Sequence, residues 1–525
     1  MAESAPQSLG EIARLQGRLN PQRTAFVFEG RSTTFADFDV RVDRVANGLS
    51  AAGVTKGSRV AYLGKNSDHY FELFFGAARI GAVIAPVNWR LAPPEAVFVL
   101  NDCRAEALFV GADCLALARS VVRDTPSLRL VVAMDGSDGD WPGYEAWRDA
   151  NPATDPGVEV GLDDVAIQLY TSGTTGRPKG VMVRNSGLFG PPRPPGVEAP
   201  GWNSWGADEV ILISMPNFHI GGTGWGFGTM LNGAKGVVTR EFDPNHVLEL
   251  IQRERITKIF LVPAAMQAVV RHPRAREIDY SSLRYVLYGA APIPLELLRE
   301  CMDVLKCGFV QMYGMTESTG AICVLPPEDH DPQGNERMRS AGKALAGVEL
   351  EIADEDGRRL PPREVGEILI RSSKNMAGYW NQPEATKKTI DADGWLHTGD
   401  AGFLDEDGYL YIRDRLHDMI ISGGENIYSA EVENAIFGHP AVADVAVIGV
   451  PDPKWGEAVR AIVVAKPGAE RDPESILAWA RERIASYKVP KAVDFIDELP
   501  RNPSGKILHR QLREHYWKGK ERRVN

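Results

Sequence analysis

Cysteine is scarce in this sequence, with five residues among 525 and no C-x-x-C pair. Disulfide frameworks and structural zinc sites need cysteines paired at short spacing, so neither is indicated. Each cysteine is expected to be a small buried hydrophobe, and a reducing cytoplasm is the compartment that fits best. The five positions are Cys103, Cys114, Cys301, Cys307 and Cys323.

Positive charge is also in deficit, with 59 Lys and Arg against 70 Asp and Glu, a net charge of -11 and a pI near 5.5. Nucleic-acid binding depends on clustered basic residues, so this balance disfavours a nucleic-acid partner. Any polyanionic ligand would therefore need a local positive site. No uncharged apolar run is long enough to span a bilayer. The N-terminus lacks the basic start and apolar core of a secretory signal.

Strand and helix patterns alternate along most of the chain. The runs RVAYLG, AVIAPVN, VAIQLY, KIFLVP and LRYVLYGA are apolar and strand-like, and helical patterns separate the first of them. Thr34 is placed to cap a helix that ends near Gly53. Alternation of this kind predicts an α/β fold with layered subdomains and mostly parallel sheets. The length predicts roughly three or four structural units.

The pattern changes after about residue 400. FLDEDGYLYIRDR is typical of a hairpin around Asp407-Gly408, and VADVAVIGV, RAIVVAKPG and PESILAWARERIAS follow as two strands and a helix. We predict a large N-terminal domain over residues 1–413 and a small mobile α+β domain over 418–525. Residues 414–417 would form the hinge between them.

Residues 187–202 are rich in proline and glycine and are predicted to form a surface loop, with a lid over a pocket as the alternative.

The segment TSGTTGRPKG, residues 171–180, follows a predicted strand and has the composition of a phosphate-binding loop. A P-loop requires G-x-x-x-x-G-K-[ST]. Here Lys179 follows Arg177-Pro178 and precedes Gly180, so the P-loop pattern is absent.

Four more motifs follow in order: QMYGMTES at 311–318, GWLHTGD at 394–400, RDRLHDMIISGGENIYSAEVE at 413–433 and NPSGK at 502–506. Together with residues 171–180 they resemble the adenylate-forming superfamily, and within it the AMP-forming acyl-CoA synthetases such as fatty-acid-CoA and coumarate-CoA ligases. The resemblance covers nearly the whole chain. It implies that a carboxylate attacks the α-phosphate of ATP to give acyl-AMP and pyrophosphate. The thiol of coenzyme A then displaces AMP.

The resemblance assigns the ATP site residue by residue. The loop at 171–179 would hold the β- and γ-phosphates, the motif at 311–317 the adenine and α-phosphate, and Asp400 the ribose hydroxyls, with Arg415 opposite it. The implied cofactor-binding residues are Thr171, Ser172, Gly173, Thr174, Thr175, Lys179, Gly289, Ala290, Ala291, Gln311, Met312, Tyr313, Gly314, Met315, Asp400, Ile412, Arg415, His417, Ser422, Gly423 and Gly424.

The same resemblance implies a magnesium ion held by Glu317 and Thr174, since one carboxylate with phosphate oxygens suffices for this ion. Thr316, Glu317, His219 and Lys506 would form the catalytic set. His219, Trp225, Gly289 and Pro292 would line an apolar acyl pocket. No charged residue stands out there as a partner for an amino-acid substrate, which favours a plain fatty, aryl or alicyclic acid.

Lys506 is predicted to approach the substrate carboxylate and α-phosphate from the C-terminal domain and to stabilise the charge that develops between them. His417 stands at the hinge, where the family usually has lysine or aspartate, and its titration would bias the domain orientation. Ser422, Gly423 and Gly424 would border the channel for the pantetheine arm of coenzyme A.

Other functions stay open from the sequence. The same motifs suit an adenylating enzyme that passes its acyl group to a carrier protein or amine, and a luciferase-like oxidation is a further possibility on this scaffold. A nucleotide-binding regulator without activity is the alternative of another class. A homodimer is plausible.

Overall fold

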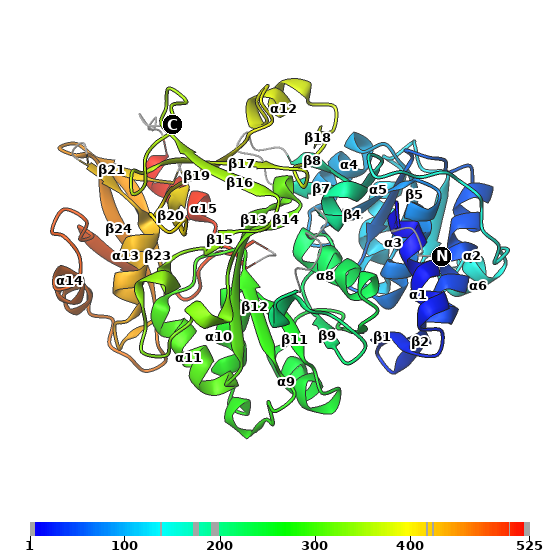
Figure 1. Ribbon diagram of the computed structural model, residues 1–525. Helices are drawn as coiled ribbons and strands as arrows, with labels where there is room; N and C mark the ends of the chain where they lie inside the picture. The colour runs from blue at the N-terminus through cyan, green and yellow to red at the C-terminus, as the bar shows by residue number, and fades with distance from the viewer. Residues whose placement is uncertain are drawn as a thin grey trace.

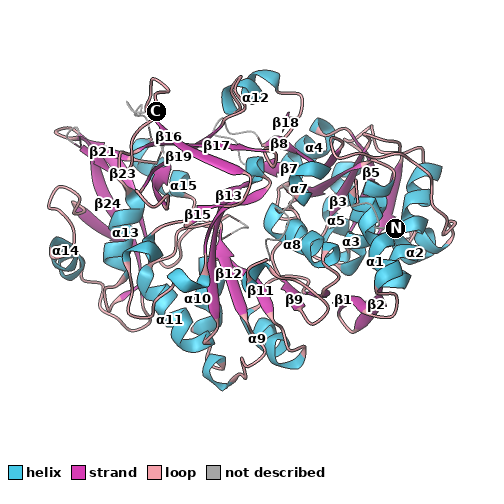
Figure 2. Ribbon diagram, in the orientation of Figure 1, coloured by secondary structure: helices cyan, strands magenta, loops and turns pink. Residues whose placement is uncertain are grey.

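The computed structural model describes residues 6–136, 139–171, 178–190, 199–415, 418–422, 425–502 and 505–518 (Figure 1). In these residues the strands form four sheets, and helices pack against them (Figure 2). The helices are α1 Leu9–Leu19, α2 Phe35–Ala51, α3 Asp68–Arg79, α4 Pro93–Asp102, α5 Leu115–Val122, α6 Tyr144–Asp149, α7 Asn185–Phe189, α8 Ile220–Leu231, α9 Pro244–Arg253, α10 Pro263–Val270, α11 Leu295–Leu305, α12 Pro383–Thr389, α13 Ser429–Phe437, α14 Pro473–Arg481 and α15 His509–Trp517.

The first sheet has seven strands in the order β18-β8-β7-β4-β3-β5-β6. Strands β7, β4, β3, β5 and β6 run parallel, whereas β8 and β18 join antiparallel at one edge. The bounds are β3 Arg59–Leu63, β4 Val83–Val87, β5 Ala105–Val110, β6 Leu130–Ala133, β7 Val165–Thr171, β8 Lys179–Arg184 and β18 Gly378–Tyr379. The predicted phosphate loop therefore joins β7 to β8.

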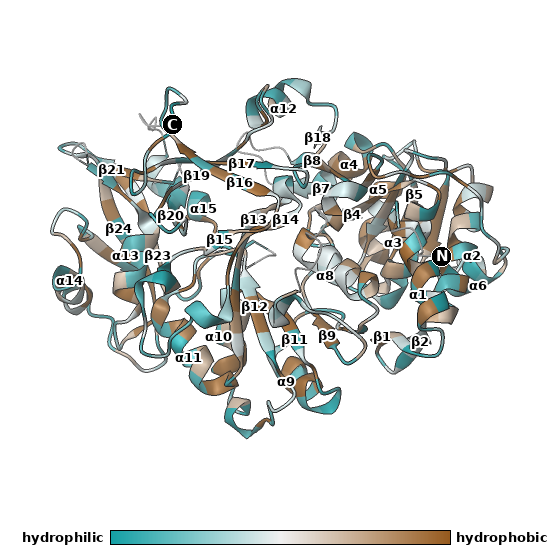
Figure 3. Cartoon of the chain, viewed as in Figure 1, coloured by the Kyte–Doolittle hydropathy of each residue, from teal (hydrophilic) through white to brown (hydrophobic). Residues whose placement is uncertain are grey.

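The second sheet has nine strands in the order β15-β14-β13-β12-β11-β9-β10-β1-β2, with parallel pairing from β13 through to β1. Its inner strands are apolar because they are covered on both faces (Figure 3). The bounds are β1 Thr24–Phe28, β2 Arg31–Thr34, β9 Val210–Ile213, β10 Lys235–Val238, β11 Lys258–Leu261, β12 Tyr285–Gly289, β13 Gly308–Met315, β14 Gly320–Leu325 and β15 Lys343–Ala344. The two sheets confirm the layered, mostly parallel α/β fold.

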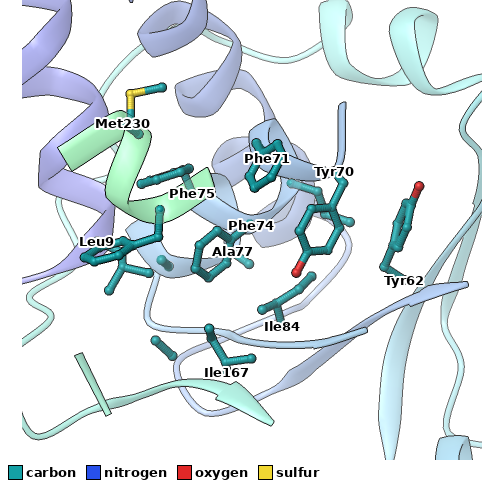
Figure 4. Packing of buried hydrophobic residues seen from close by; sticks show 14 of the residues in the cluster. Leu9, Tyr62, Tyr70, Phe71, Phe74, Phe75, Ala77, Ile84, Ile167 and Met230 are labelled. Atoms are coloured by element: carbon teal, nitrogen blue, oxygen red, sulfur yellow. The ribbon is translucent and has the colours of Figure 1, made fainter. Parts of the chain in front are cut away.

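A single apolar cluster joins the two parallel sheets. Phe71, Phe74 and Phe75 of α3 pack with Ile84 of β4 in the seven-stranded sheet (Figure 4). They also pack with Met230 of α8, the helix that joins β9 to β10 of the nine-stranded sheet. All five side chains are almost completely buried. Because aromatic side chains contribute large buried areas, this cluster fixes the two sheets relative to each other.

Helix α2 forms as the sequence predicts. Thr34 Oγ1 accepts a hydrogen bond from the backbone N–H of Asp37 at 3.1 Å, which caps the helix. The helix ends at Ala51, and Gly53 follows with a φ of +81°.

A third, antiparallel sheet has the order β16-β17-β19-β20, with bounds β16 Val348–Ala353, β17 Gly366–Ser372, β19 Leu396–Leu404 and β20 Leu410–Arg415. Strands β19 and β20 form the predicted hairpin, and Gly408 in its turn has a φ of +81°.

The C-terminal region forms the fourth sheet, in the order β22-β21-β24-β23 with β25 beside β24. The bounds are β21 Ile420–Ser422, β22 Glu425–Ile427, β23 Val442–Asp452, β24 Gly456–Ala465 and β25 Ala492–Phe495. This small α+β unit packs against α10, where Gln267 Nε2 donates to the carbonyl of Ala443 at 3.0 Å. The boundary at 414–417 and the mobility of this unit stay predictions.

The segment predicted to be an irregular loop from residue 187 is helical at its start. Helix α7 continues to Phe189 and ends at Gly190, which has a φ of +68°. The prediction is therefore wrong for residues 187–189, because the prolines that break a helix begin only at Pro191. It is also wrong at residues 201–202, where a 3-10 helix, Gly201–Asn203, begins and Trp202 is buried in the apolar cluster. Residues 191–198 lie outside the described residues, so the proposed lid is not described either.

Two expectations from composition are met in the described residues. No helix is long and apolar enough to cross a membrane in this part of the chain. All five cysteines are free thiols, four of them buried and Cys307 partly so.

Candidate functional site

The predicted site residues gather where parallel strands of the nine-stranded sheet end. His219 follows β9, Val262 follows β11, and Ala290 follows β12, while the motif at 311–315 is the end of β13 itself. Ligands of open α/β sheets bind outside the carboxyl ends of the strands. The topology thus brings four separate segments to one edge of the sheet.

Close backbone approach at this edge requires glycine. A Cβ on Gly289 would lie 2.1 Å from the carbonyl oxygen of Met312, and one on Gly314 would lie 2.0 Å from that of Gly320. Ala290 has a φ of +66°, a backbone region that costs energy for residues other than glycine. The chain is therefore packed backbone to backbone around this motif. Gln311, Met312 and Met315 lie on the same strand, and Ala291 follows Ala290.

Asp400 lies beside the end of β13. The hydroxyl of Tyr313 donates to Asp400 Oδ2 at 2.7 Å, which links the nine-stranded sheet to β19 of the antiparallel sheet. Burial, and then the Asp400 carboxylate, raise the pKa of Tyr313 well above its usual value. Tyr313 is therefore a neutral donor that fixes the position of this carboxylate. Ile412 lies on the neighbouring strand β20, partly buried against the core of the antiparallel sheet.

Glu317 and Lys179 approach the same tyrosine. The hydroxyl of Tyr379 donates to Glu317 Oε1 at 3.0 Å, and Lys179 Nζ lies 4.8 Å from the centre of the Tyr379 ring. Glu317 and Tyr379 are each only 7% exposed. Burial, and then the Glu317 carboxylate, raise the pKa of Tyr379. The start of β8 and the motif after β13 are therefore connected through one side chain.

Tyr379 was missed by reasoning from the sequence. It lies in β18, a two-residue strand that pairs with β8 in the register Tyr379 with Val181. The next residue, Trp380, is stacked under the Arg59 guanidinium, whose Cζ lies 3.5 Å from the ring centre. A stretch such as MAGYW has no spacing that marks a site, so only the strand pairing shows it.

A magnesium ion fits Glu317 as one ligand among phosphate oxygens. Among the described residues, no three His, Cys, Asp or Glu side chains cluster as a site built from protein ligands alone would need. A hard dication accepts one carboxylate plus phosphate and water oxygens, and Glu317 offers a buried carboxylate that is linked to Lys179 through Tyr379. Thr316, which precedes it, begins the same short 3-10 turn. Thr174, the second predicted metal ligand, lies outside the described residues.

His219, predicted to border the acyl pocket, is partly buried. His219 occupies the N-cap position of α8, but its side chain makes no capping hydrogen bond, and its Nε2 is buried without a hydrogen-bond partner in the described part of the chain. Burial, with a smaller effect of Arg90, lowers the pKa of His219 to about 4. The imidazole is therefore neutral at pH 7.

Trp225, also predicted to line the acyl pocket, lies on α8 six residues after His219. Its indole N–H donates to the carbonyl of Leu212 at 3.1 Å, and its rings pack against Trp205 and Phe260. Since its polar group is satisfied within the protein, Trp225 presents hydrocarbon only. Pro292, predicted to line the same pocket, is exposed in the loop after β12.

Lys506 lies in a tight turn that touches the same edge of the sheet. Its backbone N–H donates to Asn502 Oδ1 at 2.8 Å, and Arg501 bridges to Ile507 across the turn. Gly505 has a φ of +79°, and a Cβ there would lie 2.9 Å from Cγ2 of Val262. The turn that carries Lys506 therefore contacts the end of β11, the strand that pairs with β12.

Seven predicted residues lie outside the described residues, as does the side chain of Arg415. They are Ser172, Gly173, Thr174, Thr175, His417, Gly423 and Gly424. Thr171 ends β7 opposite Lys179, and Ser422 ends β21 opposite Gly456 of β24. The backbone of Arg415 pairs with Asp400 across the β19–β20 hairpin.

Two family models match the chain. The AMP-binding enzyme model matches residues 14–380, and the model of the AMP-binding enzyme C-terminal domain matches residues 431–506. The fold and the edge of the sheet described above are thus those of an enzyme that uses a nucleotide. The chain belongs to the AMP-binding enzyme family.

Relatives of known activity match over nearly the full length. A fatty acid–[acyl-carrier-protein] ligase, ScoC, from Streptomyces coeruleorubidus is 40% identical over 520 residues, which is 99% of this chain and 98% of that protein. A feruloyl-CoA synthase from an Amycolatopsis species is 41% identical over 523 residues, covering 97% of this chain and 99% of the relative. The resemblance to AMP-forming acyl-CoA ligases is confirmed, and with it the assignment as an enzyme.

A solved structure agrees with the fold. The anthranilate CoA ligase AuaEII, in complex with anthranoyl-AMP, superposes with a TM-score of 0.89 at 28% identity and covers 98% of both chains. The large N-terminal region with a smaller C-terminal unit is therefore the architecture of an adenylate-forming enzyme.

Proposed function

We propose that this chain is an ATP-dependent acyl-CoA synthetase that forms an acyl-adenylate and passes the acyl group to coenzyme A. The observation that carries the proposal is the meeting of Glu317 and Lys179 at Tyr379, beside the strand end that holds Asp400 through Tyr313. A carboxylate, a cation and a second carboxylate at one edge suit a metal-bound triphosphate and a ribose.

In the first half-reaction, an oxygen of the substrate carboxylate bonds to the α-phosphorus while the bond to the pyrophosphate oxygen breaks. Lys179 and the loop from Thr171 hold the leaving pyrophosphate, and Asp400 accepts hydrogen bonds from the ribose. Glu317 would hold a magnesium ion, which neutralises charge on the phosphates. Neutral His219 borders the acid without adding a second positive charge. Catalysis rests on placing charges before the reaction, so no protein nucleophile is needed.

Lys506 supplies the remaining cation. The proposal is supported by the position of its turn, in which the Lys506 backbone N–H donates to Asn502 and Gly505 lies against Val262 at the end of β11. In the second half-reaction, the coenzyme A sulfur bonds to the acyl carbon as the bond to AMP breaks. Ser422, with Gly423 and Gly424, is proposed to border the approach of the thiol.

Acid-dependent exchange of pyrophosphate into ATP, followed by a thioester assay with coenzyme A, tests the proposal. Lys506→Ala should lower exchange by about 10²–10³-fold, the usual loss when one preorganised electrostatic group is removed, and should spare thioester formation from supplied acyl-AMP. Lys518→Ala, at an exposed lysine of the same domain, is the control. If none of the acids in a broad panel supports pyrophosphate exchange, the proposed activity is refuted and the inactive nucleotide-binding regulator is the function that remains.

A carrier protein is the second candidate acceptor, and the ScoC relative supports it. Release of AMP with a holo carrier protein but not with coenzyme A would favour that function. Cytoplasmic location and a homodimer stay predictions.

A further inference from the structure

A closed network of polar contacts lies beside the two strands that are joined by the predicted phosphate loop. Arg59 of β3 donates from Nε to Gln168 Oε1 at 3.1 Å, and Gln168 Nε2 donates to the hydroxyl of Tyr170 at 2.9 Å. That hydroxyl donates to Asp102 Oδ2, in the last residue of α4, at 2.6 Å. These contacts run from a cation to a carboxylate through two neutral side chains.

Trp380 closes the network. Its indole N–H donates to the backbone carbonyl of Asp102 at 2.8 Å, and the Arg59 guanidinium lies over its ring. The network therefore joins β3, the end of α4, β7 and the residue that follows β18. Figure 1 shows α4 next to β7, β8 and β18 of the seven-stranded sheet.

Two members of the network lie against the two ends of the phosphate loop. Tyr170 directly precedes Thr171, the last residue of β7, and Thr171 lies opposite Lys179 in the pairing with β8. A Cβ on Gly180 would lie 2.6 Å from Gln168 Nε2. The Gln168 amide therefore lies directly against the backbone of the residue after Lys179. A shift of Tyr170 or Gln168 would move Thr171 relative to Lys179.

The network is also connected to the residue that contacts Glu317. The N–H of Trp380 donates to the carbonyl of Gly180 at 2.8 Å. Tyr379, immediately before it, donates to Glu317, and Lys179 Nζ lies 4.8 Å from the centre of its ring. Trp380 therefore joins the network to the part of the site that contains the proposed metal ligand.

Removal of one member would leave buried groups unpaired. Gln168 is fully buried, and both its amide oxygen and its amide nitrogen hydrogen-bond within the network. Burial, and then the nearby Cys103 and Asp102, raise the pKa of Tyr170 well above its usual value, so its hydroxyl is neutral and can donate. A buried polar network of this kind rigidifies the segments that it joins, and the loss of one partner leaves the others unsatisfied.

We propose that Tyr170 is a positioning residue, whose hydroxyl fixes the two ends of the phosphate loop relative to each other by joining Gln168 to Asp102. The inference rests on the proposed function, in which this loop holds the β- and γ-phosphates of ATP. Displaced loop ends weaken the binding of ATP and pyrophosphate, but they do not affect the acid or AMP, which lacks both phosphates. Residues 172–177, between the two ends, lie outside the described residues.

Tyr170→Phe removes the hydroxyl and keeps the ring. Calorimetric titrations with ATP and with AMP, each with magnesium and without an acid, compare this variant with the wild-type protein. The variant should bind ATP about 10- to 100-fold more weakly, because a displacement of about 1 Å can cost about 100-fold, and should bind AMP with unchanged affinity. In the exchange assay, KM for pyrophosphate should rise by the same factor, with KM for the acid unchanged.

Two variants of Asp102 provide the same test if Tyr170→Phe is unstable. Asp102→Asn retains an oxygen that accepts from Tyr170 and should keep the wild-type ratio of ATP to AMP affinity, whereas Asp102→Ala should reproduce the effect of Tyr170→Phe. Tyr170→Phe combined with Asp102→Ala should lose no more than either change alone, because both break the same connection. Tyr144→Phe is the matched control. Its hydroxyl donates to Glu72 Oε2 at 3.0 Å, and its loss should lower stability without changing the affinity ratio.

An unchanged ratio of ATP to AMP affinity in both Tyr170→Phe and Asp102→Ala overturns the inference. A loss that affects ATP, AMP and the acid equally also overturns it, because that pattern indicates general destabilisation. If the wild-type protein supports exchange with none of the acids tested, the proposed function is refuted, while the ATP and AMP titrations still test the role of Tyr170.

Discussion

The hydroxyl of Tyr379 gives the sharpest test of the site. It donates to Glu317 Oε1 at 3.0 Å, and both side chains are 7% exposed. Tyr379→Phe removes this donor but keeps the ring beneath Lys179. A hydrogen bond to a charged group contributes about 1.5–3 kcal/mol, which corresponds to roughly 10- to 150-fold in an equilibrium.

The loss should appear in one half-reaction only. Groups that orient a metal ligand typically affect metal affinity or activity by about 10–100-fold, so pyrophosphate exchange at a fixed magnesium concentration should fall by that factor. Raising magnesium should restore part of it. Thioester formation from supplied acyl-AMP and coenzyme A should be unchanged, because no pyrophosphate takes part.

Tyr409→Phe is the matched control. Its hydroxyl also donates to a buried carboxylate, Asp329 Oδ2 at 2.8 Å, between the start of β20 and the segment after β14. This variant should lose a similar amount of stability and keep normal exchange. Exchange and magnesium dependence that stay at wild-type values in Tyr379→Phe would refute the argument that Tyr379 positions Glu317.

Three other perturbations address the same edge of the sheet. Gly314→Ala should destabilise folding by about 1–3 kcal/mol, because its Cβ would lie 2.0 Å from the Gly320 carbonyl oxygen. Gly161→Ala, at an open position, is the control and should not destabilise the protein. Equal unfolding midpoints for the two variants would contradict this prediction. The folded pKa of His219 is about 4, below the unfolded value of 6.5, so the folded state binds fewer protons and stability falls as pH drops from 6.5 to 4. His219→Asn should remove up to about 3 kcal/mol of that acid sensitivity in denaturant titrations, and an unchanged pH dependence would refute the assignment. Asp400→Asn should raise KM for ATP about tenfold or more with KM for the acid unchanged, and the opposite pattern would exclude a ribose contact.

The hinge prediction concerns His417, which lies outside the described residues. His417→Lys should flatten the pH response of the thioester step relative to adenylation over pH 6 to 8, roughly the range in which histidine titrates. An unchanged ratio of the two half-reaction rates would show that the hinge charge does not bias the domain orientation.

Reasoning from the sequence predicted the features that depend on local patterns, namely individual strands, helices and helix caps. Strand β3 and helix α3 follow from apolar runs of the correct period, and the cap at Thr34 follows from its side chain. The glycines at 289 and 314 belong to motifs that resemble a family, although the carbonyls that require them lie on other segments. It was wrong about the start of the loop at 187, where the helix continues until proline prevents it.

The sequence did not show which residues from distant parts of the chain contact each other. Tyr379 lies 62 positions after Glu317 and 200 positions after Lys179. No local rule relates these positions, because their meeting depends on the pairing of β18 with β8 and on the packing of two sheets.

The sequence by itself thus determined the order of strands and helices, the family and the chemical types available at each motif. These follow from apolar periodicity and from residue types that the reaction needs in any member. Tertiary structure decided which charged groups come together and which tyrosine links them. Electrostatic energies depend on distance and burial, and both are set only when segments far apart in the chain pack together.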